Sequence, residues 1–585
     1  YYLFMGYTEF SNYIVRKSMV DSEGLTQKKV DLLRKKKLKK VFERRLIVID
    51  EVHNIRISDD NKNKQIAKNL IQLVRNVDGI RLLLLSATPM YNSYKEIIWL
   101  LNLMNANDRR AQINVKEVFD KTGNFIINDR GEEIGKELLI QKAIGYVSFI
   151  RGENPYTFPY RIFPKIFEVE KSITQIKYPE FALNGRSIIQ QIEHLDLYCV
   201  GIGDYQLKVY NYILKHIKDN LDDKIEFENM ERFGYTLLQY PLEALNITYP
   251  IDKIDDDDLK VNPSALVGNA GLKRIMTFKE TTKPPQRFDF EYREDILKKY
   301  GRIFSQSEIG KYSSKIKNIC SKIQESDGIV LIYSQYIDGG LVPIALALEE
   351  MGFQRYGQTK SLLKSNSKNK DALKYAMITG DKLLSPNNLS EIKAVTDESN
   401  THGEKVKVVF ISKAGSEGLD FKNIRQIHIL EPWYNTNRIE QIIGRGVRTC
   451  SHKNLSFEKR NVMIFLYGTV LPSKLEAADM YVYRLADLKA TQIGVVSRVL
   501  KQNAIDCLLN HSQTNFTEQK MNMEVELELS KKLKIKYKIG DKPFSAACDY
   551  METCDYTCRL SKNIDTTSLD TYNLSYLMVN NDRIV

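Results

Sequence analysis

The sequence predicts an α/β protein with two parallel-sheet domains, an insertion between them and a mainly helical C-terminal extension. Short runs of apolar and β-branched residues recur along the chain, and polar clusters follow them directly. Helical stretches separate the runs, which is the pattern of strand, crossover helix and parallel strand. Because 585 residues are too many for one hydrophobic core, several domains are expected.

The first sheet is predicted from two apolar runs, Leu46 to Ile49 and Leu82 to Leu85, with a helical stretch from Gln65 to Val77 between them. Runs of this composition are typical of parallel strands that are covered on both faces. Acidic residues follow the first run, and Ser86-Ala87-Thr88-Pro89 follows the second. Ligands of open α/β sheets bind beyond the carboxyl ends of the strands, so both polar clusters are expected at a ligand site.

The second sheet is predicted from three further runs and one helix, which are Gly328 to Ser334, Val406 to Ser412, Gln426 to Leu430 and the helix Leu341 to Met351. Between the two series, the acidic run Asp255 to Asp258 and the turn-rich Lys283-Pro284-Pro285 indicate an insertion or a mobile connector. After Leu475 the spacing of apolar residues is helical, and the charged stretch from Glu518 to Lys538 is expected to be helical as well. We therefore expect four parts, residues 1–164, 165–310, 311–475 and 476–585.

Composition narrows the class of protein. Apolar residues make up 43% and charged residues 27%, as in soluble proteins. The sequence has no uninterrupted apolar run of about 18 residues, the length that spans a bilayer, so no membrane partner is expected.

Eighty-six Lys and Arg against 74 Asp and Glu leave a net charge of +12, which favours a polyanionic partner. Basic residues are densest at Lys28-Lys29, Arg34 to Lys40 and Arg44-Arg45, where either a solvated helix face or a nucleic-acid contact fits. Seven sparse cysteines favour a reducing compartment.

The tetrad Asp50-Glu51-Val52-His53 carries groups that nucleotide hydrolysis needs. Asp50 can hold Mg²⁺ through its water shell, and Glu51 can orient and deprotonate an attacking water. An acidic cluster at the start of a helix is the alternative. Downstream, Ser86 and Thr88 offer two hydroxyls that can hydrogen-bond the acids and couple their state to the second domain, or can simply cap the next segment.

A second set of candidate residues lies in Gln441-Ile442-Ile443-Gly444-Arg445-Gly446-Val447-Arg448. We expect Arg445 and Arg448 on one helical face, where guanidinium groups can stabilise charge on a transferring phosphoryl group; a generic basic helix is the alternative. The preceding stretch from Ser412 to Asp420 reads as a glycine-rich turn after a strand. There Gly418 allows close approach to a nucleotide, and Asp420 can accept from a ribose hydroxyl.

In this order, these motifs resemble superfamily 2 helicases and translocases, over about residues 45 to 450. A finer likeness, to the ATPases that large nucleocytoplasmic DNA viruses use in transcription, comes from four further segments, Gly6-Tyr7-Thr8-Glu9-Phe10, Arg151 to Pro159, Leu430-Glu431-Pro432-Trp433-Tyr434-Asn435 and Ala504-Ile505-Asp506-Cys507. Those ATPases resemble the Swi/Snf branch, which moves along duplex DNA without unwinding it.

The resemblance implies two RecA-like domains that use ATP and Mg²⁺ in the cleft between them. By this resemblance, Asp50 is the acid that holds magnesium and Glu51 the acid that activates water. Gln441, Arg445 and Arg448 of the second domain then act on the phosphoryl group from across the cleft. His53, Ser86 and Thr88 become the coupling residues. Contacts with a nucleic-acid backbone are implied for six residues, although a turn or strand-end residue without a ligand fits each equally well: Thr8, Ser334, Thr379, Gly380, Ser412 and Lys413.

The implied function is ATP-driven translocation on DNA, with RNA as the other candidate, in viral transcription initiation or termination. The implied partners are the viral RNA polymerase or a transcription-factor subunit, and the implied location is the viral factory in the host cytoplasm, the virion or the host nucleus. A strand-separating DNA or RNA helicase is a second hypothesis. A scaffold without ATPase activity, which binds DNA or the polymerase, is the third.

One motif of the family is missing from the chain. A phosphate loop ends in Gly-Lys-Ser/Thr, and the only Gly-Lys pairs, Gly135-Lys136 and Gly310-Lys311, lack the hydroxyl and follow the acids instead of preceding them. Since the sequence begins at Tyr1 instead of Met, we expect the loop upstream of Tyr1. We also expect the chain as written to bind ATP poorly or not at all.

Three cysteines near the C-terminal end, Cys548, Cys554 and Cys558, raise the question of zinc. Their C-x5-C-x3-C spacing is not that of a known finger, and a fourth ligand is not evident nearby. Either a zinc site or ordinary reduced thiols fits this pattern.

Overall fold

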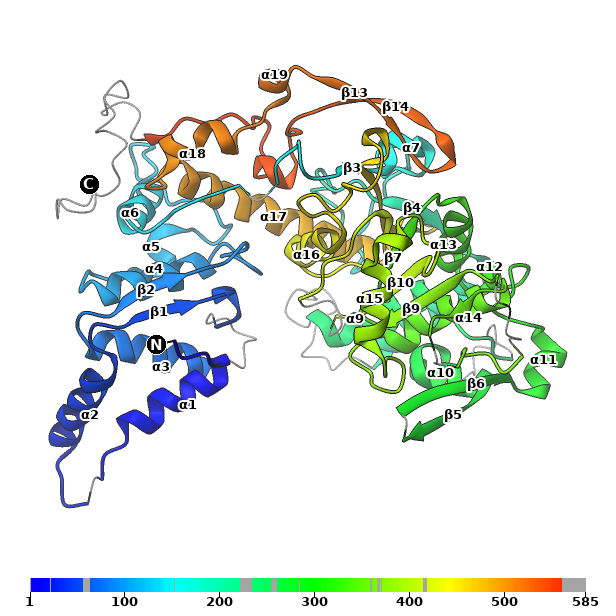
Figure 1. Ribbon diagram of the computed structural model, residues 1–585, viewed down its shortest axis with the longest axis horizontal. Helices are drawn as coiled ribbons and strands as arrows, with labels where there is room; N and C mark the ends of the chain where they lie inside the picture. The colour runs from blue at the N-terminus through cyan, green and yellow to red at the C-terminus, as the bar shows by residue number, and fades with distance from the viewer. Residues whose placement is uncertain are drawn as a thin grey trace. The chain divides into compact units, whose positions relative to one another are not determined.

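The computed structural model describes residues 2–21, 23–55, 64–151, 153–220, 234–252, 254, 260–283, 285–357, 360–365, 369, 371–413 and 418–559 (Figure 1). The chain divides into two compact units. Unit 1 comprises residues 1–151, 488–517 and 541–585, and unit 2 comprises residues 152–487 and 518–540. Among the described residues, no helix has the length and apolar character that crossing a membrane requires.

Unit 1 is built around two parallel strands, β1 (Leu46–Ile49) and β2 (Arg81–Leu84), in the register Leu46 to Arg81 and Ile49 to Leu84. The crossover helix α3 (Lys64–Asn76) joins them, as the sequence predicts, and its apolar side packs under the strands. The remaining helices are α1 (Tyr7–Ser18), α2 (Gln27–Phe42), α4 (Glu96–Asn107), α5 (Val115–Val118), α6 (Ile134–Ala143) and α18 (Cys507–Thr514).

The expectation that both faces of β1 and β2 are covered is wrong. Ile47, Leu82 and Leu84 pack on the core, but the side chains that alternate with them point outward. Leu46 is 60% exposed and Val48 51% exposed. An apolar run therefore identified the strands correctly, although no element among the described residues of unit 1 covers their second face.

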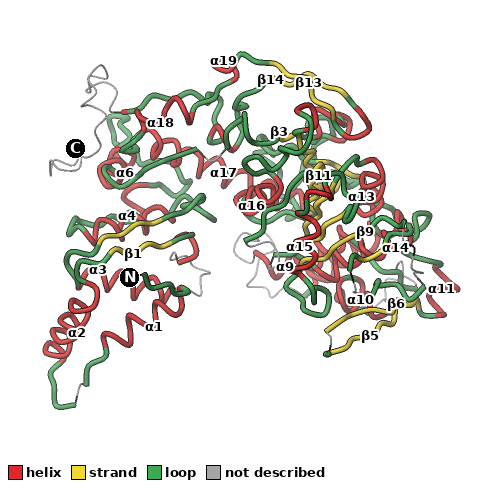
Figure 2. The backbone as a smooth tube through the Cα atoms, viewed as in Figure 1, coloured by secondary structure: helices red, strands yellow, loops and turns green. Residues whose placement is uncertain are grey.

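Unit 2 contains a wholly parallel sheet of eight strands among the described residues, in the order β3-β12-β11-β7-β10-β9-β8, with β4 also pairing to β12 (Figure 2). The strands are β3 (Tyr160–Ile162), β4 (Tyr198–Gly201), β7 (Ile329–Tyr333), β8 (Gln354–Arg355), β9 (Lys374–Ile378), β10 (Val408–Ile411), β11 (Ile424–Ile429) and β12 (Asn461–Val470). The predicted α/β class is confirmed, and so are the predicted strands at β7, β10 and β11.

Helices cover both faces of this sheet, which explains why its central strands β7 and β10 are almost entirely apolar. One face packs against α16 (Thr436–Gly446) and the first half of α17 (Ala478–Gln502). The other face packs against α13 (Ser314–Glu325) and α14 (Val342–Glu350). The other helices of the unit are α7 (Pro164–Phe167), α8 (Asp204–Asp219), α9 (Gly234–Asn246), α10 (Gly268–Ile275), α11 (Glu294–Tyr300), α12 (Ile309–Tyr312), α15 (Asn388–Thr396) and α19 (Glu518–Met521).

The segment expected to be an insertion, residues 165–310, is part of unit 2. Strand β4 lies within it and pairs with β12, and β3 joins the same sheet just before it. The segment also forms an antiparallel hairpin of β5 (Met276–Thr282) and β6 (Pro285–Tyr292), away from the parallel sheet (Figure 2). The acidic run Asp255 to Asp258 lies outside the described residues. The unit boundary at residues 151 and 152 thus differs from the predicted one because pairing with β12 draws residues after 152 into the second sheet.

The C-terminal extension is helical only in part. Where a helix was expected near Lys538, two strands, β13 (Glu524–Glu528) and β14 (Lys534–Lys538), form an antiparallel hairpin. Charged and apolar residues alternate along both strands, a period of two that places Val525 and Tyr537 against the unit 2 core. The high charge of the stretch concealed this alternation.

Candidate active site

The acidic pair lies at the carboxyl end of β1, as the sequence predicts. Asp50 and Glu51 are exposed, and the carboxylate of Asp50 accepts the backbone N–H of Glu51 at 3.0 Å. Glu51 has a φ of +46°, a left-handed conformation that a non-glycine residue adopts only under constraint. One constraint is Tyr7, whose hydroxyl donates to the carbonyl of Asp50 at 2.8 Å.

His53 connects Glu51 to the second polar cluster. Its Nδ1 lies 3.2 Å from a carboxylate oxygen of Glu51 and 3.0 Å from the hydroxyl of Ser86 at the end of β2. The ring is buried and stacks on Tyr91, with the centroids 5.0 Å apart and the planes 5° from parallel. Parallel pairing of β1 with β2 therefore brings Glu51, His53 and Ser86 together.

Thr88 and Glu96 shape the loop that follows Ser86. The hydroxyl of Ser86 accepts the backbone N–H of Thr88 at 3.0 Å, and the Thr88 hydroxyl oxygen is buried without a hydrogen-bond partner among the described residues. Glu96, also buried, accepts the N–H groups of Tyr91 at 2.7 Å and Asn92 at 3.1 Å. These bonds fix the loop that holds Tyr91 against His53.

In unit 2, three predicted nucleic-acid contacts lie at the carboxyl ends of neighbouring strands. Ser334 follows β7, Thr379 follows β9 and Ser412 follows β10, and the hydroxyl of Ser412 accepts the N–H of Gly380 at 3.3 Å. All three side chains are buried. Lys413 is exposed, with its ammonium group 5.5 Å from the ring centroid of Trp433. In unit 1, Thr8 is exposed in the first turn of α1.

Ser334 has a buried acidic partner, Glu431, at the end of β11. The hydroxyl donates to Glu431 at 2.9 Å, and the carboxylate also accepts the N–H of Gln335 at 2.6 Å and the side-chain amide of Asn246 at 2.8 Å. Burial raises the pKa of Glu431 to about 7, although these hydrogen bonds and the nearby Lys315 oppose the shift. The Ser334 hydroxyl is thus engaged inside unit 2, and its role as a nucleic-acid contact stays a prediction.

Replacing Glu431 with Gln is expected to remove a pH dependence of stability. Because the pKa is about 7 in the fold and 4.5 as a free side chain, the folded state binds more protons between these values, so the free energy of unfolding falls as pH rises through this window. The shift corresponds to ~3 kcal/mol. Scanning calorimetry at pH 5 and pH 8 should show Glu431→Gln gaining stability relative to the wild type at pH 8; an equal difference at both pH values would contradict the assignment.

The arginine motif is split at the end of α16. Gln441 and Arg445 lie one turn apart on the helix and are half-buried, whereas Arg448 is exposed two residues after the helix ends at Gly446. The expectation that Arg445 and Arg448 lie on one helical face is therefore wrong, because the helix ends before Arg448. The Arg445 guanidinium donates to the carbonyl of Leu419 at 3.3 Å.

The predicted nucleotide contacts lie beside these arginines. Asp420 pairs with Arg448, with 2.9 Å between Nε and the carboxylate, so its predicted role at a ribose competes with this ion pair. Gly418 is exposed with φ at +72°, and a Cβ there would meet nothing within 4 Å. The intervening residues of the glycine-rich turn, 414–417, lie outside the described residues.

The chemistry of the acids fits magnesium, since carboxylate oxygens are ligands it prefers and Asp50 is exposed at the strand end. Neither Gly-Lys pair forms a phosphate loop. Gly135-Lys136 lies in α6 and Gly310-Lys311 in α12, and each lysine pairs at 2.7 Å with a glutamate of its own helix region, Glu133 or Glu308. The chain therefore carries acids whose chemistry fits magnesium but no Gly-Lys-Ser/Thr sequence to hold the phosphates.

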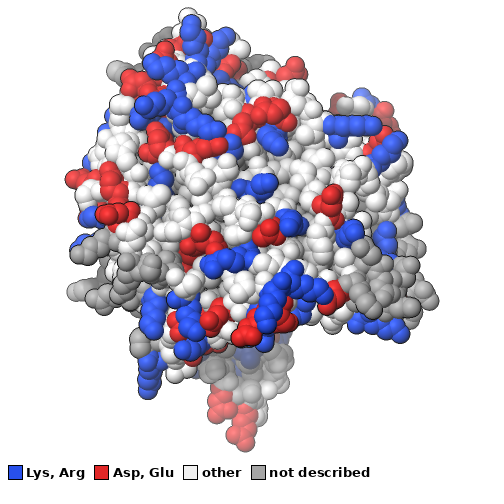
Figure 3. Space-filling view, turned by 90° about the vertical axis from the view of Figure 1, so that its right-hand side faces the viewer, with Lys and Arg blue, Asp and Glu red and all other residues white. Residues whose placement is uncertain are grey.

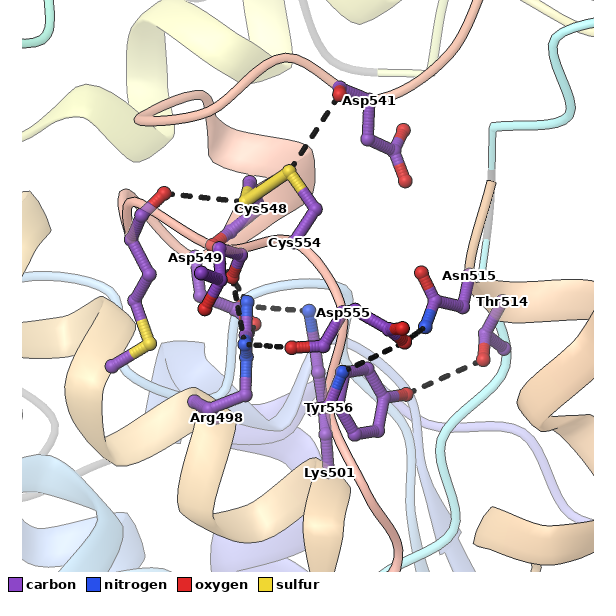
Figure 4. The surroundings of a disulfide bond; sticks show 12 residues. Arg498, Lys501, Thr514, Asn515, Asp541, Cys548, Asp549, Cys554, Asp555 and Tyr556 are labelled. Atoms are coloured by element: carbon purple, nitrogen blue, oxygen red, sulfur yellow. Dashed lines mark hydrogen bonds and ion pairs between the residues drawn. A yellow bond between two sulfur atoms is a disulfide. The ribbon is translucent and has the colours of Figure 1, made fainter. Parts of the chain in front are cut away.

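The zinc hypothesis is not supported by the cysteine arrangement. Cys548 is bonded to Cys554 (Figure 4) and Cys558 to Cys507, so the three thiols do not converge on one point. In the part of the chain that is described, no group of three His, Cys, Asp or Glu side chains could hold a metal ion. The alternative of reduced thiols at Cys548, Cys554 and Cys558 is wrong as well, since all three are in disulfides, whereas Cys199, Cys320 and Cys450 are free.

Sequence reasoning missed Tyr7, Tyr91 and Glu96. Each acts through the backbone or through ring stacking, which leaves no spacing pattern to detect. Tyr7 stands beside the predicted Thr8, within a segment that the resemblance had singled out.

Comparison with known proteins agrees with this geometry. The profile of the SNF2-related domain matches residues 17–141, within unit 1, and that of the helicase conserved C-terminal domain matches residues 314–450, within unit 2.

Three relatives come from large DNA viruses. A protein of Acanthamoeba polyphaga mimivirus named as an ATP-dependent RNA helicase, R563, is 27% identical over 82% of this chain. The helicase 087L of Invertebrate iridescent virus 3 is 24% identical over 82%, and the termination factor NPH-I homolog of African swine fever virus is 23% identical over 80%. The alignments cover 69%, 41% and 63% of these relatives' own lengths.

Three observations agree with one another. The two domain matches follow in order along the chain, His53 of the acidic tetrad is hydrogen-bonded to Ser86, and α16 of unit 2 carries Arg445. The chain thus carries an SNF2-related domain and a helicase C-terminal domain, and it is similar to helicases of large DNA viruses.

Proposed function

We propose that the chain is the motor of an ATP-driven translocase that moves along double-stranded DNA and serves viral transcription, in initiation or termination. The observation that carries this proposal is the contact of the Glu51 carboxylate with His53, which is itself bonded to Ser86. A carboxylate at a strand end that is linked to the next strand can both activate water and report its state to the rest of the motor.

In this proposal Mg²⁺-ATP supplies the phosphoryl group when bound. Asp50 holds the metal's water shell, and Glu51 orients the attacking water and takes its proton. Arg445 and Arg448 supply guanidinium groups for the charge that develops on the phosphoryl oxygens. To do so, Arg448 exchanges its ion pair with Asp420 for the nucleotide.

A nucleic-acid partner is supported by the charge of α2. Its face opposite the buried Val30 and Leu38 carries six exposed lysines, Lys28, Lys29, Lys35, Lys36, Lys39 and Lys40. Of these, only Lys39 has a carboxylate partner among the described residues, Glu43 at 3.4 Å. By contrast, the side of the molecule where Figure 1 draws β5, β6 and α11 shows positive and negative side chains interspersed (Figure 3). A one-signed helix face of this kind suits a phosphate backbone.

The transcription role is supported by the African swine fever virus relative, which is named as a termination factor. On this proposal the partners are the viral RNA polymerase or a transcription-factor subunit, in the viral factory, the virion or the host nucleus. The mimivirus relative, named as an RNA helicase, favours the alternative of a strand-separating helicase.

The test is ATP hydrolysis by the protein in its full natural length, measured without nucleic acid and with duplex DNA, single-stranded DNA or RNA. We expect duplex DNA to stimulate hydrolysis most, and we expect the protein to displace the third strand of a DNA triplex while leaving a forked duplex paired. Stimulation by RNA with opening of the fork would establish the helicase instead. Hydrolysis that no nucleic acid stimulates would contradict the translocase hypothesis. Nucleic-acid binding without any hydrolysis would support the hypothesis of a scaffold without ATPase activity.

A further inference from the structure

One segment that the sequence singled out, Arg151 to Pro159, has no role in the function proposed above. Residues 153–161 overlap this segment and extend it by two residues, and we call them the brace. They lie at the start of unit 2, directly after the chain leaves unit 1. The brace ends in β3, which lies beside β12 in the sheet with Arg161 opposite Val462.

The sheet register places Arg161 on the face that α16 covers. Val462 belongs to the core cluster that contains Ile439, Ile442 and Ile443 of α16, whereas Tyr160 and Ile162 belong to the cluster of the opposite face. Since side chains alternate along a strand, Arg161 points toward α16.

There Arg161 joins two carboxylates. Its guanidinium donates to Glu440 of α16 at 2.6 Å and also to Glu153, at the start of the brace. The Arg161 side chain is only 18% exposed. Burial disfavours its charge, but the carboxylates of Glu440 and Glu153 outweigh burial and raise the pKa of the guanidinium. The Arg161 guanidinium therefore carries its charge at any physiological pH.

A second contact holds the chain beyond the arginines. The backbone N–H of Cys450 donates to the carbonyl of Thr157 at 2.7 Å, and Thr157 lies in a turn that Asn154 closes by accepting the N–H of Thr157 and Phe158, both at 3.0 Å. The brace thus contacts the chain on both sides of Arg445 and Arg448. It contacts Glu440, which precedes them in the sequence, and Cys450, which follows them.

We propose that Arg161 is a positioning residue for hydrolysis, which through Glu440 sets the rotation of α16 and hence the direction of the Arg445 guanidinium. The inference rests on the proposed function, since it assigns Arg161 a part in placing a group that acts on ATP. Misplacement of a reacting group by about 1 Å can lower the rate ~100-fold. A side chain that fixes the rotation of α16 can therefore have a large effect on kcat.

The experiment compares Arg161→Met and Glu440→Gln with Arg484→Met as the matched control. Arg484 has a side chain of similar exposure, 17%, and pairs through two nitrogens with buried Glu476 at 2.8 and 3.0 Å, but it lies on α17. We expect both test variants to lower kcat by ~10 to 100-fold with KM for ATP little changed, while Arg484→Met keeps wild-type kcat even if its Tm falls as much. Arg161→Lys, which keeps the charge but lacks the rigid, planar set of N–H donors, should fall in between.

The decisive variant combines Arg161→Met with Arg445→Lys. Because Arg161 acts through Arg445, the double variant should be no slower than Arg445→Lys alone, whereas independent effects would multiply. A wild-type kcat in Glu440→Gln and Arg161→Met, or multiplied losses in the double variant, would overturn the inference. Absence of hydrolysis in the wild-type protein would instead refute the proposed function, so the two failures are distinguishable.

Discussion

Replacement of Glu51 with Gln is expected to lower the rate of ATP hydrolysis by ~100 to 10,000-fold, the usual contribution of a positioned general base. The amide keeps the size of the side chain and one acceptor oxygen, but it cannot take a proton from water. Asp50 is unchanged, so nucleotide and nucleic-acid binding should stay close to wild type. The measurement is steady-state turnover of the full-length protein, with binding followed by fluorescence anisotropy of labelled duplex DNA.

Glu43→Gln is the matched control for this substitution. Glu43 is also an exposed glutamate close to β1, and its carboxylate pairs only with Lys39, at 3.4 Å, among the described residues. The same chemical change there should leave turnover within about twofold, since exposed ion pairs contribute little. Equal turnover in Glu51→Gln and Glu43→Gln would remove Glu51 from the reaction.

Arg445→Lys and Arg448→Lys are expected to lower kcat by ~1,000-fold or more, within the range for arginines that act on a transferring phosphoryl group. Lysine keeps the positive charge, but it lacks the planar pair of N–H donors that spans two phosphoryl oxygens. Binding of the nucleic acid should change little, because neither residue is assigned to its backbone.

Arg460→Lys serves as the control for the arginine variants. Arg460 is half-buried in unit 2 and donates to the carbonyls of Leu455 and Lys453, neither of which belongs to α16. We expect wild-type kcat from this variant. If Arg445→Lys and Arg448→Lys also retained wild-type kcat, the arginine motif would be structural and the proposed reaction would need a different cation.

The sequence predicted those parts of the fold in which composition and position agree. The strands β1, β2, β7 and β10 are short, mainly apolar and closely followed by polar residues, and each of them, like β11, is present where it was expected. The same reasoning placed Asp50, Glu51 and Ser86 at one sheet edge, because parallel neighbours end on the same side.

Three features could not be read from local patterns. Coverage of β1 depends on what packs against it, so an apolar run could not show that Val48 is 51% exposed. The hairpin at residues 524–538 alternates charged and apolar residues, and its high charge resembled that of a solvated helix. The pairing of Cys558 with Cys507 joins residues 51 positions apart, a distance that spacing within the C-terminal cysteine cluster cannot reveal. In the site, Tyr91 and Arg161 act through stacking and long-range ion pairing, which only tertiary structure creates.

The disulfide between Cys507 and Cys558 has a topological consequence. Both cysteines belong to unit 1, yet residues 518–540, which lie between them in the chain, belong to unit 2. The bond therefore closes a covalent ring that passes through both units, with the β13–β14 hairpin built into the second. A single break in the backbone anywhere on this ring leaves the two pieces attached, and they separate only when the sulfur bridge is also reduced.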